Sequence, residues 1–148
     1  MNGRVRNIKF DELNQLLELY KHLNPDDPEL TIDEGLKKLW YEIMDNPNHF
    51  CLVIEDEGTI VSSCILVIVK NLTRNARPYA LIENVVTHED YRKKGYGTAI
   101  LKRAMEIAKE ENCYKVMLMT SSKEEQIFRF YEKSGFDSEE KTAFIKRM

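Results

Sequence analysis

Apolar residues recur every three or four positions in two stretches near the amino terminus. The first stretch follows a short apolar segment at residues 5–10 and stops near Pro25. The second stretch opens on Thr31 and Glu34, which have the spacing of a capping box, and stops near Pro47. Because apolar residues at this spacing cover one face of a helix, we expect a first strand and then two amphipathic helices.

Continuous apolar runs replace the helical spacing in the middle of the chain. Residues 50–55 and 60–70 are apolar and separated by a turn that contains Gly58, which predicts a β-hairpin. A polar loop follows at residues 71–78. Residues 79–87 then form an apolar run interrupted by Glu83 and Asn84, which predicts a strand buried on both faces.

The last third of the chain alternates between the two patterns. We expect a helix at residues 95–111, a strand at 114–120, a helix from about 124 to 133, and two short strands that reach Met148. A strand, helix, strand succession favours parallel strands. The sequence therefore predicts a mixed α/β sheet in a single domain spanning residues 1–148.

The composition of the chain argues against several classes of protein. The chain has 148 residues, 43% of them hydrophobic, and its 22 Lys and Arg against 25 Asp and Glu leave a net charge of −3, which gives nucleic-acid binding no support. The longest apolar run, residues 64–69, is far shorter than the roughly 20 residues that span a membrane. The first ten residues lack the apolar region of an export signal. We expect a cytoplasmic enzyme or binding domain with no membrane partner.

The cysteines do not indicate a metal site or a disulfide. Cys51, Cys64 and Cys113 are an odd number, and none has a second cysteine or a histidine at metal-ligand spacing. We therefore expect free thiols and no metal.

The segment YRKKGYGT, residues 91–98, has the residue types that bind an anion between a strand and a helix. Arg92 and the next two lysines supply positive charge, Gly95 and Gly97 let a ligand approach the backbone, and amide groups at a helix start point outward. A pyrophosphate fits this description, and the alternative is a solvated basic turn. The P-loop motif is absent, and Ile100 stands where the dinucleotide fingerprint needs its third glycine.

Two motifs together resemble one family. Arg92-x-x-Gly95-x-Gly97 after an apolar strand resembles the acetyl-CoA pyrophosphate loop of the GNAT superfamily of N-acetyltransferases, and FYEKSGF at residues 130–136 resembles its FYxxxGF signature. The order of predicted elements agrees over essentially the whole chain. The resemblance implies a GNAT-like fold, with a splayed central β-sheet flanked by helices on both faces, and a homodimer.

The resemblance also implies that an acetyl group passes directly from acetyl-CoA, the co-substrate, to a primary amine. The pyrophosphate of acetyl-CoA would bind the loop, and the pantetheine arm would lie along the strand before it. The implied cofactor contacts are Val85, Val86, Arg92, Lys93, Lys94, Gly95, Tyr96, Gly97 and Thr98.

Two ionisable residues match the catalytic roles that the family implies. Glu83 would act as the base toward the amine, directly or through water, because burial in an apolar strand makes a carboxylate more basic. Tyr131 lies in the FYxxxGF segment, where the family pattern has the proton donor to the CoA thiolate. Alternatively, Glu83 pairs with a structural Arg or Lys, and Tyr131 is a core aromatic residue.

One position departs from the family pattern. Many members carry Asn seven residues before this tyrosine, where the chain has Glu124. A carboxylate repels the phosphates of CoA, so we expect Ser121 or Ser122 to make the polar contact instead. The histidines are expected to be surface or capping residues: His22, His49 and His88.

Charged residues gather in two loops that surround the acceptor site in this fold. The acidic loop contains Asp26, Asp27, Glu29, Asp33 and Glu34, and the basic loop contains Lys70, Arg74 and Arg77. An amine that also carries an anionic group satisfies both loops. Residues 82–86 are similar to the matching segment of small-metabolite acetyltransferases, such as those acting on glucosamine 6-phosphate or aminoalkylphosphonates.

Three alternatives stay open at this stage. Both charge clusters could be solvated loops. The acceptor could be a protein N-terminus or a lysine side chain rather than a small amine. The chain could also be a non-catalytic module that binds acyl-CoA without turnover.

Overall fold

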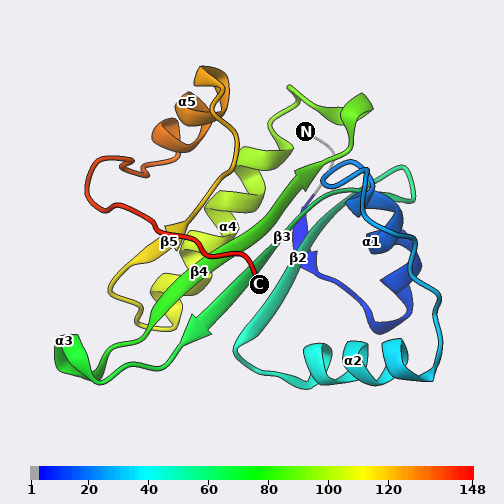
Figure 1. Cartoon of the computed structure of the whole chain (residues 1–148), viewed down its shortest axis with the longest axis horizontal. Coiled ribbons are helices and arrows are strands. Elements are labelled where there is room, and N and C mark those ends of the chain that lie inside the picture. The colour runs from blue at the N-terminus through cyan, green and yellow to red at the C-terminus, as the bar shows by residue number, and fades with distance from the viewer. Residues whose placement is uncertain (1–3) are drawn as a thin grey trace.

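A five-stranded sheet forms the centre of the computed structural model, which describes residues 4–148 (Figure 1). The strands are β1 (Val5–Asn7), β2 (His49–Asp56), β3 (Thr59–Val69), β4 (Tyr79–Thr87) and β5 (Val116–Leu118). They lie in sequence order, with antiparallel neighbours from β1 to β4 and a parallel pair β4–β5. The predicted mixed sheet and its parallel strand pair are confirmed. Residues 1–3 of the predicted domain lie outside the described residues.

Helices cover both faces of the sheet. The longer ones are α1 (Leu13–Tyr20), α2 (Glu34–Asp45), α4 (Tyr96–Glu110) and α5 (Glu125–Lys133), and the short ones are η1 (Phe10–Glu12), α3 (Thr73–Ala76) and η2 (Glu89–Tyr91). In Figure 1, α1 and α2 lie on one side of the sheet, and α4 and α5 on the other. Among the described residues, the structure has no helix with the length and apolar character that crossing a membrane requires.

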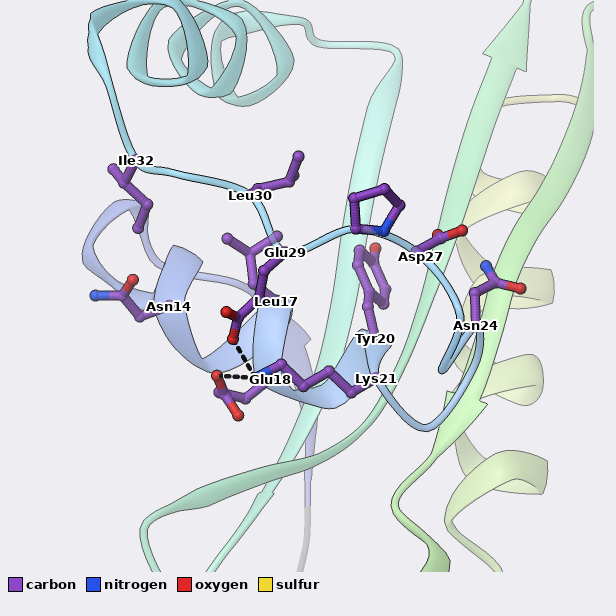
Figure 2. A pocket seen from close by; sticks show the side chains of 11 residues that line it. Asn14, Leu17, Glu18, Tyr20, Lys21, Asn24, Asp27, Glu29, Leu30 and Ile32 are labelled. Carbon is purple, nitrogen blue, oxygen red and sulfur yellow. Dashed lines mark hydrogen bonds and ion pairs between the residues drawn. The ribbon is translucent and has the colours of Figure 1, made fainter.

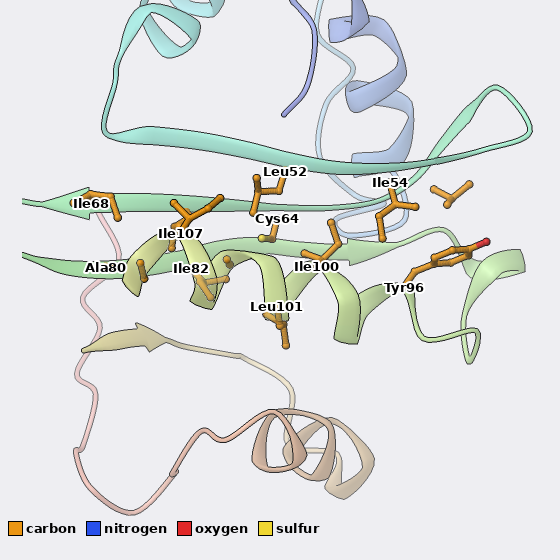
Figure 3. Close-up of a cluster of buried hydrophobic side chains, with 14 residues drawn as sticks. Leu52, Ile54, Cys64, Ile68, Ala80, Ile82, Tyr96, Ile100, Leu101 and Ile107 are labelled. Carbon is orange, nitrogen blue, oxygen red and sulfur yellow. The ribbon is translucent and has the colours of Figure 1, made fainter. Parts of the chain in front are cut away.

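Two hydrophobic cores hold these layers together. The core under α4 includes Leu52, Ile54, Leu66, Ile82, Ile100 and Leu101 (Figure 3). The core under α1 and α2 includes Leu16, Leu19, Trp40, Val53 and Ile65. Neighbouring residues of β2 enter different cores because successive side chains of a strand point to opposite faces. For this reason the sequences of β2 and β3 are continuously apolar and do not alternate between apolar and polar residues.

The sheet is splayed between β4 and β5. The two strands pair only where Ala80, Leu81 and Ile82 meet Val116, Met117 and Leu118. Beyond Ile82, β4 continues to Thr87, and on that side no strand of the described residues pairs with it. A bulge lies at the point of divergence, where Asn84 has a φ of 52° and the register against β3 shifts. The implied splay is confirmed.

Several local predictions are wrong. No strand forms after α5 in the described residues, because residues 137–148 pair with no neighbouring strand and stay exposed. The N-cap of α2 is Asp33 rather than Thr31: the Leu36 amide donates to Asp33 Oδ1 at 2.9 Å. The predicted loop at 71–78 contains the short helix α3. The first strand, expected over residues 5–10, ends at Asn7, because the chain turns into η1 at Phe10.

Candidate functional site

The start of α4 presents backbone amide groups without a capping side chain. Gly95 is the N-cap residue, with a φ of 85°, a left-handed conformation that glycine adopts at little cost. In the described residues no side chain caps this end, and the first turn carries no acidic residue. The amides of Tyr96, Gly97 and Thr98 precede the first possible intrahelical partner. Together with the dipole of a 15-residue helix, they form a site for an anion.

Two predicted contact residues in this loop use their side chains elsewhere. Arg92 donates from Nε to the Thr87 carbonyl at 3.1 Å and from Nη2 to the His22 carbonyl at 3.5 Å, so its guanidinium braces the loop. Tyr96 is buried, and its hydroxyl donates to the Asp56 carboxylate, which raises the pKa of Tyr96 to about 12. These residues can therefore offer an anion their backbone amides.

The two lysines and the threonine of the loop are exposed. Lys94 Nζ lies 4.9 Å from the ring centroid of Tyr91, and Lys93 adopts a left-handed φ of 62°. Thr98 is exposed in the first turn of α4. The lysine charges thus lie beside the bare helix start, where they favour an anion.

The unpaired part of β4 carries the remaining residues predicted on that strand. Val86 is buried under α1, whereas Val85 packs toward α4. Glu83 is exposed, so the predicted burial of its carboxylate is wrong. It pairs with Ile65 of β3, which is in the core under α1 and α2, so Glu83 lies on that face of the sheet without being buried there. No ion pair or side-chain hydrogen bond involves Glu83 among the described residues, so the alternative of a structural pair gains no support.

Tyr131 lies on α5, on the α4 side of the sheet. Its ring is half-buried, 5.0 Å from the Phe130 centroid and 6.3 Å from that of Phe136, and it packs against the same core as Val85. Burial, with a smaller effect of nearby Cys64, raises the pKa of the Tyr131 hydroxyl. This hydroxyl therefore keeps its proton at neutral pH and can donate it.

The residues before α5 differ from the family pattern as predicted. Glu124 Oε2 accepts from Gln126 Nε2 at 2.9 Å, so this carboxylate is engaged within the helix start. Ser122 Oγ accepts from the Glu124 amide at 3.2 Å, and Ser121 is exposed. Of the two serines, only Ser121 has a hydroxyl without a partner among the described residues.

A cavity of about 420 Å³ lies between α1 and the segment that follows it. Figure 2 shows Lys21 between the carboxylates of Glu18 and Glu29, at 2.8 and 3.0 Å. Asp27 adds a third carboxylate, and Leu17, Leu30 and Ile32 form apolar walls. The lining therefore carries more negative than positive charge.

Tyr20 lies between this cavity and the bulge of β4. Its ring lines the cavity, and its hydroxyl lies near the Asn84 side chain, next to Glu83. Burial raises the pKa of Tyr20, so the hydroxyl stays protonated. Sequence reasoning treated Tyr20 only as part of an apolar helical stripe. A hydroxyl on the otherwise aliphatic face of α1 is the signal that could have identified it.

The basic loop lies elsewhere. Arg77 donates from Nε to the Asn112 carbonyl at 3.1 Å and from Nη2 to the Cys113 carbonyl at 3.0 Å, at the start of β4. Figure 1 shows α3, which carries Arg74, far from α1. The acidic and basic loops therefore do not surround one cavity, and the prediction that both contact a single small acceptor is wrong.

Comparisons with known proteins agree with one another. The model of the "Acetyltransferase (GNAT) family" matches residues 14–136. Glucosamine 6-phosphate N-acetyltransferase of Trypanosoma brucei brucei is 40% identical over 84 residues, covering 57% of this chain and 55% of the relative. Streptothricin acetyltransferase A of Bacillus subtilis is 33% identical over 110 residues, covering 70% and 62%.

A solved structure covers nearly the whole chain. The putative acetyltransferase from Agrobacterium tumefaciens str. C58 is 43% identical, with a TM-score of 0.92, over 98% of this chain and 99% of its own. By contrast, the chain spans less than two thirds of the length of the two curated relatives.

Proposed function

The chain belongs to the acetyltransferase (GNAT) family, and from that premise we propose that it is an acetyl-CoA-dependent N-acetyltransferase of small metabolites. A single domain spanning residues 1–148 carries the activity. The reaction moves the acetyl group directly from acetyl-CoA to a primary amine.

The observation that carries this proposal is the bare helix start beside an open strand edge. The amides of residues 96–98 donate hydrogen bonds to the pyrophosphate of acetyl-CoA, with Lys93 and Lys94 beside them. The unpaired backbone of β4 beyond Ile82 hydrogen-bonds the amides of the pantetheine arm, as a neighbouring strand would. Val85 and Val86 contact the cofactor there.

Glu83 and Tyr131 divide the proton transfers. The amine nitrogen attacks the thioester carbonyl carbon, and its proton passes to Glu83 directly or through water. As the C–S bond breaks, the Tyr131 hydroxyl donates its proton to the departing CoA thiolate. The exposed Glu83 is accessible to an incoming amine, and the half-buried Tyr131 is protonated at neutral pH.

The acceptor is a small amine, and two classes have support. The name of the trypanosomal relative supports an amino-sugar phosphate. The carboxylates of the cavity beside α1 instead favour an amine that carries further positive charge, as the name of the streptothricin acetyltransferase also suggests. Tyr20, which lines the cavity, lies near Asn84, the residue that follows Glu83 in β4.

Thiol release from acetyl-CoA across a panel of acceptors tests this function. The panel contains glucosamine 6-phosphate, glucosamine, an aminoalkylphosphonate, polyamines, streptothricin and lysine-containing peptides. We expect turnover of at least one small amine and none of the peptides. Turnover of peptides alone would identify a protein acetyltransferase, and acetyl-CoA binding without any turnover would identify a non-catalytic module.

We further propose a homodimer. Phe144 and Ile145 in the carboxyl-terminal segment are 92% and 73% exposed, and a second copy would bury these apolar side chains. Sedimentation at micromolar concentration should give a dimer, and deletion of residues 137–148 should give a monomer. A monomeric intact chain would overturn this part of the proposal. The cytoplasmic location stays a prediction.

A further inference from the structure

Two histidine rings stack between α1 and the loop that precedes α4. His22 follows α1, and His88 follows β4. Their ring centroids are 4.0 Å apart, with the planes inclined by 37°. Both residues are half-buried, and the proposed reaction uses neither.

His88 also fixes the turn that leads into the loop. Its Nδ1 accepts from the Asp90 amide at 3.1 Å, which makes it the side-chain cap of η2. Its backbone amide donates to the Val61 carbonyl at 2.8 Å, and its carbonyl accepts from the Tyr91 amide at 2.9 Å. His88 thus joins β3, η2 and, through the ring stack, the end of α1.

The contacts continue into residues 91–94, which lead to the start of α4. The Tyr91 ring lies edge-on to the His88 ring at 5.3 Å, and Lys94 Nζ lies over the Tyr91 ring. Arg92 bridges the carbonyls of Thr87 and His22. Residues 92–94 belong to no helix or strand, so these side-chain contacts hold the backbone that leads to Gly95.

We propose that His88 is a positioning residue for acetyl-CoA. Its ring, stacked on His22, and its Nδ1 acceptor hold residues 89–95 so that the amides of residues 96–98 face the pyrophosphate. The inference rests on the proposed function, because it assumes that this loop binds acetyl-CoA. His88 itself does not touch the cofactor, so its loss weakens acetyl-CoA binding rather than the chemical step.

Three substitutions separate the two contacts. His88→Asn keeps a side-chain acceptor for the amide two residues on, as in an Asx-turn. His88→Phe keeps a ring on His22 but has no acceptor, and His88→Ala loses both. The free energy lost with a helix cap corresponds to about a fivefold rise in the acetyl-CoA Kd, if all of it is lost from binding.

We expect calorimetry to give an acetyl-CoA Kd raised about fivefold in His88→Phe and more in His88→Ala, with most of the affinity restored in His88→Asn. The KM for acetyl-CoA should follow the Kd, while kcat stays near that of the unaltered enzyme. His22→Phe should bind like the unaltered enzyme, and His22→Ala more weakly. His49→Ala, a change at the distant end of β2, is the matched control.

The outcomes distinguish this inference from the function on which it rests. If the unaltered chain does not bind acetyl-CoA, both the proposed function and the inference fail. If the unaltered chain binds acetyl-CoA, and His88→Phe and His88→Ala bind it as tightly as the unaltered chain does, the inference alone fails. Equal losses of affinity in His88→Ala and His49→Ala would also overturn it, because a general loss of stability would then explain the effect. Should His88→Ala not fold, the comparison of His22→Phe with His22→Ala decides in the same way.

Discussion

A Cβ atom at Gly97 would lie 3.0 Å from Cζ of Phe130, closer than ordinary van der Waals contact. The glycine loop and the FYxxxGF segment, far apart in the sequence, therefore meet at this point. The sequence interpretation gave Gly97 the role of letting a ligand approach. The structure adds a packing role, because α5 approaches the first turn of α4 here.

Gly97→Ala should destabilise the protein and weaken acetyl-CoA binding, because the new methyl group displaces Phe130 or the start of α4. Overpacking of this kind costs about 1–3 kcal/mol in free energy of unfolding. Urea unfolding and calorimetry measure the two effects. Adding Phe130→Leu, which shortens the opposing ring, should recover part of the loss. An alanine variant as stable as the parent would contradict the packing role.

The apolar pattern correctly predicts the elements that depend on residues close to one another in the sequence. The bounds of β4 agree with the predicted 79–87, and α4 agrees within one residue at each end. In both, the extent of the element follows from the apolar pattern of residues that are close in the sequence. The predicted turn at Gly58, with its positive φ, forms for the same local reason.

Properties that depend on distant neighbours were not predictable from the pattern. Glu83 lies in an apolar run, yet it is exposed, because the helices on the face that it shares with Ile65 do not bury it. Arg92 looked like a ligand for a phosphate, and its guanidinium instead binds the His22 carbonyl, 70 residues away in the sequence. The sequence predicted two short strands after α5, but no strand of residues 4–148 lies beside this segment to pair with it.

The free energy of unfolding should fall at alkaline pH. Burial raises the pKa of the Cys51 thiol from 9.0 to about 11 and that of Cys64 from 9.0 to about 12. Above pH 9 the unfolded chain therefore loses thiol protons that the folded chain keeps, so stability decreases with pH until the folded values are passed. Each thiol contributes on the order of 1 kcal/mol per pH unit in this window.

Urea unfolding between pH 7 and 10.5 tests this dependence. Cys64→Ala should have a shallower decline above pH 9 than the parent, although it is less stable at pH 7 because of the cavity it leaves. Cys113→Ala, at a half-buried thiol, is the control and should flatten the decline less. A parent protein equally stable at pH 7 and pH 10.5 would show that the buried thiols do not act this way.

Asp27→Asn should weaken the binding of a positively charged acceptor and leave the binding of a neutral or anionic acceptor unaffected. Asp27 lines the cavity beside α1 and has no ion pair among the described residues, so its charge is available to an occupant. Removing one exposed charge should raise the KM of a polyamine about two- to fivefold. Equal effects on a polyamine and on glucosamine would exclude this cavity as the charge-selective site.

Glu83→Gln should lower kcat/KM for the acceptor on the order of 10² or more, the range expected for the loss of a general base. The amide cannot take the amine proton, so deprotonation would depend on solvent. Activity near neutral pH should fall, and the remaining rate should rise with the fraction of free amine. Glu42→Gln, at an exposed carboxylate on α2, is the matched control. If Glu83→Gln turns over like the parent, another group is the base.

Tyr131→Phe should lower kcat on the order of 10² or more, the range expected for the loss of an acid catalyst. The ring contacts with Phe130 and Phe136 remain, so acetyl-CoA binding and the free energy of unfolding should change little. Calorimetry, urea unfolding and steady-state kinetics with a saturating acceptor give the three quantities. Tyr114→Phe makes the same chemical change at a half-buried tyrosine near the start of β4 and should leave kcat unchanged.

The basicity of the donor's leaving thiolate sharpens this prediction for Tyr131. A thiolate of lower basicity needs less help from a proton donor, so an acetyl thioester of a more acidic thiol should lose less rate in Tyr131→Phe than acetyl-CoA does. Because burial raises the pKa of the Tyr131 hydroxyl, the parent should also keep its kcat through pH 9, where an unburied phenol begins to ionise. If Tyr131→Phe turns over like the parent, Tyr131 is a core aromatic residue and the thiolate takes its proton from solvent.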